Sequence, residues 1–191
     1  MKVLVTGAGG FIGSRLCKKL ISEGHEVYGV IHNSPPQTEG IQIINADLTK
    51  NDFIIPDVKF DVVFHLAAAT PLVKDKKKQK RINYEGTVNL FEKIKDKTDF
   101  VIYASGLGVF GNTNEVVTEQ SLIQPDTDFV KIRLDAQRFL EKSCKENNIG
   151  FSVCYFGDVY GNANWFTEMI VKRLKNGTFK IPGKGDYDKC F

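Results

Sequence analysis

The 191-residue chain has little excess charge and few cysteines. Its 26 lysine and arginine residues are nearly balanced by 23 aspartate and glutamate residues, which leaves a formal net charge of +3. This excess is too small to indicate a nucleic-acid partner or an anionic membrane. The four cysteines form no C-x-x-C pair and have no histidine at a zinc-ligand spacing. The sequence therefore predicts neither a metal site nor a disulfide framework, and reduced thiols favour a cytoplasmic location.

Long apolar runs are also missing. None is long enough to cross a bilayer, so no membrane association is expected. The start, MKVLVTGAGG, has no basic segment followed by an apolar one, so no signal peptide is expected. A hydrophobic fraction of 42% and a charged fraction of 26% are typical of an ordinary globular protein with a buried core.

Short apolar runs alternate with amphipathic segments along the chain. Strands are expected at 2–7, 25–31, 41–48, 61–68, 99–105 and 150–161, and helices at 11–24, 79–96, 126–147 and 165–177. Strands that are apolar throughout are buried on both faces of a parallel sheet. The pattern predicts an α/β fold, a doubly wound Rossmann-type parallel sheet of about six strands with helices on both faces. The basic run at 74–81 is interpreted as a solvated loop and first helical turn, with a phosphate-binding patch as the alternative.

The stretch VTGAGGFIG places three glycines at intervals of three between the first expected strand and the first expected helix. Glycine permits a tight turn, and the helix N-terminus then offers free N–H groups to a diphosphate. The motif matches neither the G-x-G-x-x-G fingerprint nor a Walker loop. The turn nevertheless predicts dinucleotide binding, the alternative being a structural turn without a ligand. The predicted diphosphate contacts are Gly7, Gly10, Phe11, Ile12 and Gly13.

The spacing T-G-x-x-G-x-x-G from Thr6 to Gly13 resembles the extended short-chain dehydrogenase/reductase family, which includes NAD-dependent nucleotide-sugar epimerases and dehydratases. The later stretches NADLTK, DVVFHLAA, INYEGTVNL and GDVYG are similar to family segments in the same order. The resemblance implies adenine contacts from Asp47 and Leu48 and a structural role for Asn83. It also implies that His65, Leu66, Ala67 and Ala68 lie along the cofactor, with a further contact from Phe156.

The end of the second expected strand bears on the choice between NAD and NADP. Enzymes that use NAD commonly place an acid there to bind the ribose 2′-hydroxyl. This chain has Ile31, His32 and Asn33 instead, and His32 would donate to a 2′-phosphate. The sequence therefore favours NADP(H) over NAD(H). The alternative is that His32 is an exposed loop residue without a role.

The family's usual proton relay consists of a tyrosine, a lysine four residues later and a serine or threonine after the fifth strand. Alignment places Phe129, Arg133 and Gly106 at these positions, with Ser105 one residue earlier. Phenylalanine has no ionisable proton and glycine has no side chain, so the usual relay is expected to be absent. Arginine keeps the positive charge and can bind the nicotinamide ribose. Ser105 and Arg133 are the remaining catalytic candidates. Tyr103, Tyr155, Tyr160, Asp126 and Asp128 are expected near the site as substitutes.

The resemblance implies an NAD(P)-binding epimerase/dehydratase-like oxidoreductase that acts on a nucleotide sugar or a small carbonyl or hydroxyl substrate. The alternative is a non-catalytic NADP(H)-binding redox sensor or scaffold protein, so the sequence leaves catalysis open. Residues 1–177 are expected to form the NAD(P)-binding domain, and 178–191 the start of a truncated substrate lobe. The family's partner surface implies a homodimer through the helices at 79–96 and 126–147.

Overall fold

The computed structural model describes residues 1–35, 38–113, 115–162 and 165–177, without the side chains of Trp165 and Phe166. The chain divides into two compact units, Met1–Tyr155 and Phe156–Phe191. The expected start of a substrate lobe, residues 178–191, lies outside the described residues. The domain boundary after residue 177 therefore stays a prediction.

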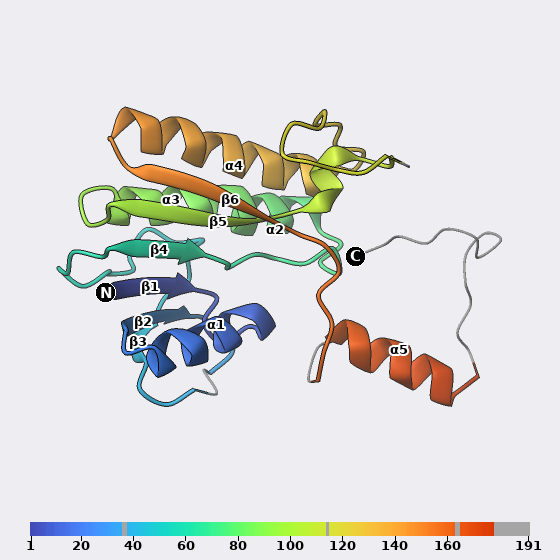
Figure 1. Cartoon of the computed structure of the whole chain (residues 1–191), viewed down its shortest axis with the longest axis horizontal. Helices are drawn as coiled ribbons and strands as arrows, with labels where there is room; N and C mark the ends of the chain where they lie inside the picture. The colour runs from blue at the N-terminus through green and yellow to red at the C-terminus, as the bar shows by residue number, and fades with distance from the viewer. Residues whose placement is uncertain (36–37, 114, 163–164, 178–191) are drawn as a thin grey trace. The chain divides into compact units, whose positions relative to one another are not determined.

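Six strands form one sheet in the order β3-β2-β1-β4-β5-β6 (Figure 1). Their bounds are β1 (Lys2–Thr6), β2 (Glu26–Ile31), β3 (Gln42–Asn45), β4 (Val62–His65), β5 (Phe100–Gly106) and β6 (Gly150–Phe156). β1 pairs in parallel with both β2 and β4, β2 with β3, and β4 with β5. This is the strand order of a doubly wound Rossmann sheet, so the predicted fold class is confirmed.

The helices of the first unit are α1 (Phe11–Ser22), α2 (Lys76–Lys80), α3 (Gly86–Ile94) and α4 (Asp128–Glu146), with a 3-10 turn η2 (Leu107–Phe110). The helix expected at 79–96 begins earlier, because the Asp75 carboxylate accepts the N–H groups of Lys77 and Lys78. Between α2 and α3 it contains a π-helical turn, η1 (Arg81–Glu85). α4 begins where the Thr127 hydroxyl accepts the N–H of Val130.

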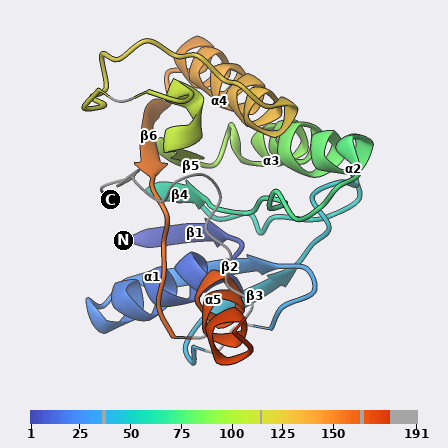
Figure 2. The same cartoon turned by 90° about the vertical axis from the view of Figure 1, so that its right-hand side faces the viewer.

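Two hydrophobic clusters lie on opposite faces of the sheet. α1 packs on one face, and α3 and α4 cover the other (Figure 2). Alternation along β1 explains the division, because Val3 and Val5 contact the α1 cluster whereas Leu4 contacts the α3 and α4 cluster. Thr6 follows the same alternation and belongs to the α3 side.

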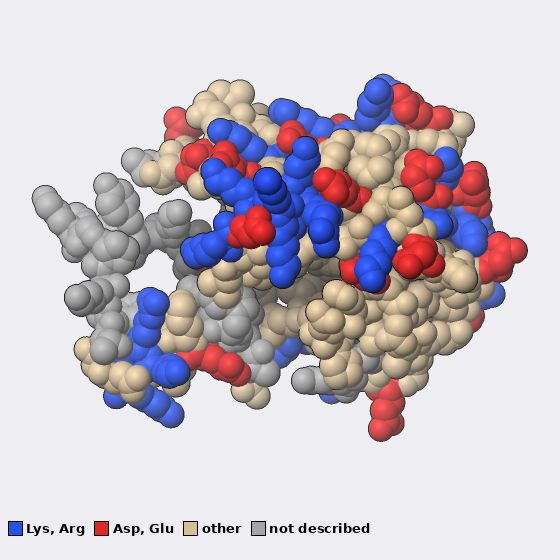
Figure 3. Space-filling view, turned by 180° about the vertical axis from the view of Figure 1, so that it is seen from behind, with Lys and Arg blue, Asp and Glu red and all other residues tan. Residues whose placement is uncertain are grey.

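The basic run at 74–81 forms the end of the loop after β4, then α2, then the first residue of η1. Its six lysine and arginine side chains are exposed, and basic side chains gather on this side of the molecule (Figure 3). Lys76 forms an ion pair with Asp128 of α4. The run is therefore a solvated loop and first helical turn, as the sequence predicts.

The second unit contains α5 (Trp165–Lys175). Gly161 precedes this helix, and its N–H donates to the hydroxyl of Thr167, which lies within the helix, at 3.0 Å. No helix in the described part of the chain is long and apolar enough to cross a membrane. Among the same residues, no three His, Cys, Asp or Glu side chains gather into a group that could hold a metal ion.

Candidate functional site

The glycine turn joins β1 to α1 with almost no space between its backbone segments. Gly7 has a φ of +69°, in the left-handed region that favours glycine, and its carbonyl accepts the Gly10 N–H at 2.8 Å. A Cβ on Gly13 would lie 2.8 Å from the Gly7 carbonyl carbon and closer still to its oxygen. The third glycine is therefore required for α1 to start directly against the turn.

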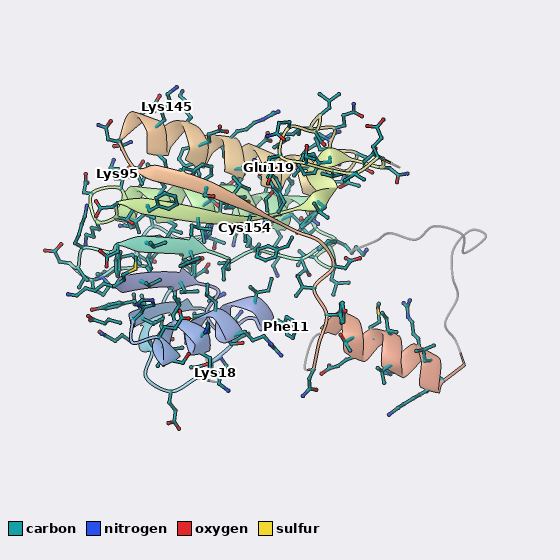
Figure 4. All side chains as sticks on the ribbon, viewed as in Figure 1. Phe11, Lys18, Lys95, Glu119, Lys145 and Cys154 are labelled. Atoms are coloured by element: carbon teal, nitrogen blue, oxygen red, sulfur yellow. The ribbon has the colours of Figure 1, made fainter. Side chains whose placement is uncertain are left out.

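The start of α1 is open to an anion. Gly10 is the N-cap, and no side chain of the described residues caps it. The first turn contains no acidic residue, so the helix dipole and its free N–H groups are not neutralised locally. Phe11 marks this end of the helix (Figure 4), and the Arg15 guanidinium lies 3.6 Å from its ring centroid. The predicted diphosphate contacts thus occupy one backbone surface that fits a dinucleotide diphosphate.

A buried hydrogen-bond chain connects β1, β4 and α3 next to this turn. The Thr6 hydroxyl oxygen accepts the N–H groups of Leu66 and Ala67, each at 3.1 Å, and its hydrogen is donated to His65 Nδ1 at 2.7 Å. His65 Nε2 lies 2.8 Å from the Thr87 hydroxyl oxygen. The Thr87 hydrogen is used on the carbonyl of Asn83, so Nε2 must carry the proton and donate.

This arrangement requires a neutral imidazole. A proton on Nδ1 would face the Thr6 oxygen, which already accepts two N–H groups. Burial lowers the pKa of His65 from 6.5 to about 3, with a further contribution from the charge of Arg133. His65 therefore has a structural role: it fixes the end of β4 and the backbone of the segment that follows.

The segment after β4 lies against the glycine turn. A Cβ on Gly7 would be 3.0 Å from the Ala67 nitrogen. The Asn83 side chain holds the far end of the segment, accepting the Ala69 N–H at 2.7 Å and donating to the Ala69 carbonyl at 3.4 Å. Ala68 is exposed between these two attachments. The predicted cofactor residues after β4 are thus brought together with those of the glycine turn.

Three further predicted cofactor residues follow β2 and β3: His32, Asp47 and Leu48. His32 Nε2 lies 3.9 Å from Asp47 Oδ2. The other oxygen of Asp47 accepts the Thr49 N–H at 3.0 Å and the Thr49 hydroxyl at 2.7 Å. These bonds, the Thr49 hydroxyl first, hold the pKa of Asp47 below its ordinary value. Leu48 packs against the larger hydrophobic cluster.

The positions of the usual proton relay are occupied as follows. Phe129 is half-buried in the first turn of α4, and Gly106 ends β5. Ser105 is buried, and its Oγ has no hydrogen-bond partner among the described residues. An unpaired buried hydroxyl is costly, and among the described side chains Gln137 Oε1 is the other buried polar atom without a partner.

Arg133 is attached to β5. Its guanidinium donates to the carbonyl of Ala104 and lies 5.3 Å from the ring centroid of Tyr103. The Tyr103 hydroxyl in turn donates to the Arg133 carbonyl at 3.2 Å. The cation predicted to bind the ribose thus lies at the carboxyl end of β5, beside the buried Ser105.

Sequence reasoning missed Gln137, a buried polar residue next to the candidate site. It lies one turn beyond Arg133 on α4, is buried, and donates to the Tyr155 hydroxyl at 2.9 Å. The Tyr155 ring packs on Phe110 with centroids 5.1 Å apart. The sequence signal was available, because a glutamine four residues after Arg133 shares its helix face.

The other proposed substitutes are less suited to proton transfer. Tyr103 is buried, and burial raises the pKa of its hydroxyl. Asp128 is exposed and paired with Lys76. Asp126 is exposed, and Tyr160 belongs to the second unit, as does Phe156, which is a predicted cofactor contact.

Strand order and site together define the class of protein. The order reverses between β1 and β4, and ligands of open α/β sheets bind outside the carboxyl ends of the strands at such a switch point. The glycine turn follows β1 and the segment held by Thr6 and Asn83 follows β4, so both lie at this point. The chain is a Rossmann-type protein of the dinucleotide-binding architecture.

The family follows from comparison with known proteins. The model of the NAD dependent epimerase/dehydratase family matches residues 3–188, and the chain belongs to this family. A UDP-glucose 4-epimerase of Mycolicibacterium smegmatis is 28% identical over 178 residues, covering 84% of this chain and 57% of that protein.

Two solved structures come from one enzyme. UDP-glucuronic acid 4-epimerase from Bacillus cereus in complex with NAD has a TM-score of 0.75 and 30% identity, covering 92% of this chain and 63% of that one. A tyrosine-to-phenylalanine variant of it, in complex with UDP-4-deoxy-4-fluoro-glucuronic acid and NAD, has a TM-score of 0.78 and 28% identity, covering 92% and 64%. The chain thus spans less than two thirds of the length of each of these proteins.

Proposed function

We propose that this chain binds a nicotinamide dinucleotide, NAD(H) or NADP(H), and acts as a nucleotide-sugar epimerase/dehydratase-type oxidoreductase. One observation carries the proposal: the uncapped start of α1, packed on three glycines, lies next to the backbone that Thr6 and Asn83 hold after β4. The family of the chain supports the same conclusion. NAD would accept a hydride from a substrate carbon and return it.

Six of the predicted residues have separate roles in this proposal. Backbone N–H groups of Phe11, Ile12 and Gly13 would hold the diphosphate. Asp47 and Leu48 would contact the adenine. Arg133 would bind the nicotinamide ribose, for which its guanidinium would move off the Ala104 carbonyl or share its N–H groups. The five N–H donors of arginine allow sharing.

The proton relay is the weak part of the proposed enzyme. Phe129 cannot exchange a proton and Gly106 cannot orient a substrate oxygen. Ser105, one residue before Gly106, would be the hydroxyl that replaces the usual serine. In the Bacillus cereus enzyme, a tyrosine-to-phenylalanine variant is found with NAD and a substrate analogue. Phenylalanine at one position is thus compatible with binding in that protein. We infer retained binding and slow turnover for this chain.

Two finer points belong to the same proposal. The absence of an acid at the end of β2, with His32 present, favours NADP(H) over NAD(H). A homodimer through α3 and α4 would match the family's usual partner surface, and light scattering of the purified chain measures it directly.

A fluorescence titration of the purified chain with NADH and NADPH tests the binding proposal. Saturable binding in the micromolar range is expected, because the diphosphate surface is preformed. Competition by NAD or NADP is the control for specific binding. Interconversion of UDP-glucose and UDP-galactose is then assayed, with slow turnover expected. Saturable binding without any turnover would favour the non-catalytic alternative, and no binding at all would overturn the proposal.

Restoring the relay should increase activity. The double change Phe129→Tyr with Arg133→Lys places a phenol and an amine one turn apart on α4, and a gain of about tenfold or more is expected from general acid–base catalysis. Turnover per mole of cofactor-loaded protein is the measurement. Arg138→Lys, on the exposed side of the same helix, is the matched control. An unchanged rate with intact cofactor binding would argue against the assigned positions.

A further inference from the structure

No acidic residue directly follows β2, but one lies beside its end in the structure. This residue is Asp47, which follows the neighbouring strand β3. β2 and β3 pair in parallel with Ile31 beside Asn45, and the Ala46 N–H donates to the Ile31 carbonyl at 2.9 Å. The segments that follow β2 and β3 therefore leave the sheet side by side. His32 follows one strand and Asp47 the other, and their side chains meet at 3.9 Å.

The direction of the Asp47 carboxylate is fixed. Thr49 occupies Oδ1 with its N–H and its hydroxyl, so Oδ2 is the oxygen that faces His32. The same hydrogen bonds lower the pKa of Asp47, which is therefore an anion at neutral pH. Its side chain is 24% exposed, against 57% for His32, so the carboxylate is the better-held member of the pair.

The loop after β2 is itself held close to the glycine turn. A Cβ on Gly9 would lie 2.8 Å from the carbonyl carbon of Ser34, and closer to its oxygen. A dinucleotide bound at the turn would thus have its adenosine ribose beside His32. Rossmann proteins bind the 2′-hydroxyl or 2′-phosphate of this ribose at that place. Any charge near His32 then acts on that group.

We propose that the His32–Asp47 pair sets the discrimination between NAD(H) and NADP(H), with Asp47 supplying the negative charge that the end of β2 lacks. This rests on the proposed binding of a dinucleotide. His32 donates to the 2′ group, whereas the Asp47 carboxylate repels a 2′-phosphate and tolerates a 2′-hydroxyl. The ratio of the two affinities is therefore a balance between two neighbouring side chains.

Dissociation constants for NADH and NADPH, measured by fluorescence titration, test the pair. Asp47→Asn removes the charge, and the amide oxygen can still accept both bonds from Thr49. NADPH affinity relative to NADH is expected to rise by about tenfold. His32→Ala is expected to lower the same ratio. In the double variant the two effects should not add, because the residues are in contact.

Asp52→Asn is the matched control, since it removes the same charge from an exposed residue of the next loop and should leave the ratio unchanged. Thermal unfolding shows whether each variant is folded, and His32→Ala, at an exposed position, carries the test if Asp47→Asn does not fold. An unchanged ratio in folded variants that still bind NADH would overturn this inference alone. Failure of the unmodified chain to bind either nucleotide would overturn the proposed function, and this inference with it.

Discussion

Replacing Gly13 with alanine is expected to weaken NADH binding strongly and to destabilise the first unit. The added Cβ would meet the backbone of Gly7, which cannot rotate away as a side chain could. α1 would have to move off the turn, and the diphosphate surface would be lost with it. A loss of affinity of roughly 100-fold or more and a cost of about 2–4 kcal/mol in the free energy of unfolding are expected.

Titration with NADH and urea unfolding measure the two effects. The matched control is Gly24→Ala, the same chemical change after the end of α1. Gly24 has a φ of +79°, and no other described atoms lie within 4 Å of a Cβ built there. It should cost only about 1 kcal/mol for the left-handed backbone and leave binding intact. If both variants bind NADH equally well, the close packing at Gly13 is not what forms the site.

Acidification is expected to destabilise the folded chain well before most carboxylates titrate. His65 is neutral in the folded state, with a pKa of about 3 against an ordinary value of 6.5. Unfolding therefore takes up a proton between these two values. The stabilisation is fully present above pH 6.5 and decreases as the pH falls toward 3, by up to about 1.4 kcal/mol for each pH unit.

Urea unfolding of the unmodified chain and of His65→Gln between pH 7.5 and 4.5 measures this slope. The variant lacks the titrating group, so the difference between the two curves removes the contribution of carboxylates such as Glu26, whose lowered pKa acts in the same direction at lower pH. His25→Gln, at the loop after α1, is the control and should keep the steep slope. A flat profile for the unmodified chain would mean that His65 can accept a proton without opening the structure.

The fold was predictable because its signals are local. Val3, Leu4 and Val5 are apolar in succession, as a strand buried on both faces requires, and the three glycines lie within seven residues. The resemblance to a family then pointed to Asn83, whose side chain bonds the Ala69 backbone in the structure, and to Asp47, whose adenine contact stays a prediction.

The contacts between distant residues were not predictable in the same way. His65 was expected along the cofactor, but its bonds to Thr6 and Thr87 join residues 59 and 22 positions away. Periodicity describes which face a residue occupies, and it does not say which polar groups meet there. The same reason explains why the pairing of Gln137 with Tyr155 was missed.

The His32–Asp47 contact is the clearest example of a pairing that the sequence alone does not reveal. Sequence reasoning looked for an acid at the end of β2 and found none. In a parallel sheet, the neighbouring strand lies only about 4.8 Å away, so the residues that follow it can reach the same ribose position. An acid 15 residues further along the chain can therefore lie against His32, and only the register of β2 with β3 reveals it.

The hydrogen-bond chain through His65 also has a dynamic consequence. Each of its hydrogens has one acceptor, and the side chains of Thr6, His65 and Thr87 are no more than 2% exposed. The Nε2 hydrogen can reach solvent only when α3 separates from the sheet. Its exchange with deuterated solvent, followed by nuclear magnetic resonance, thereby reports how often that layer opens.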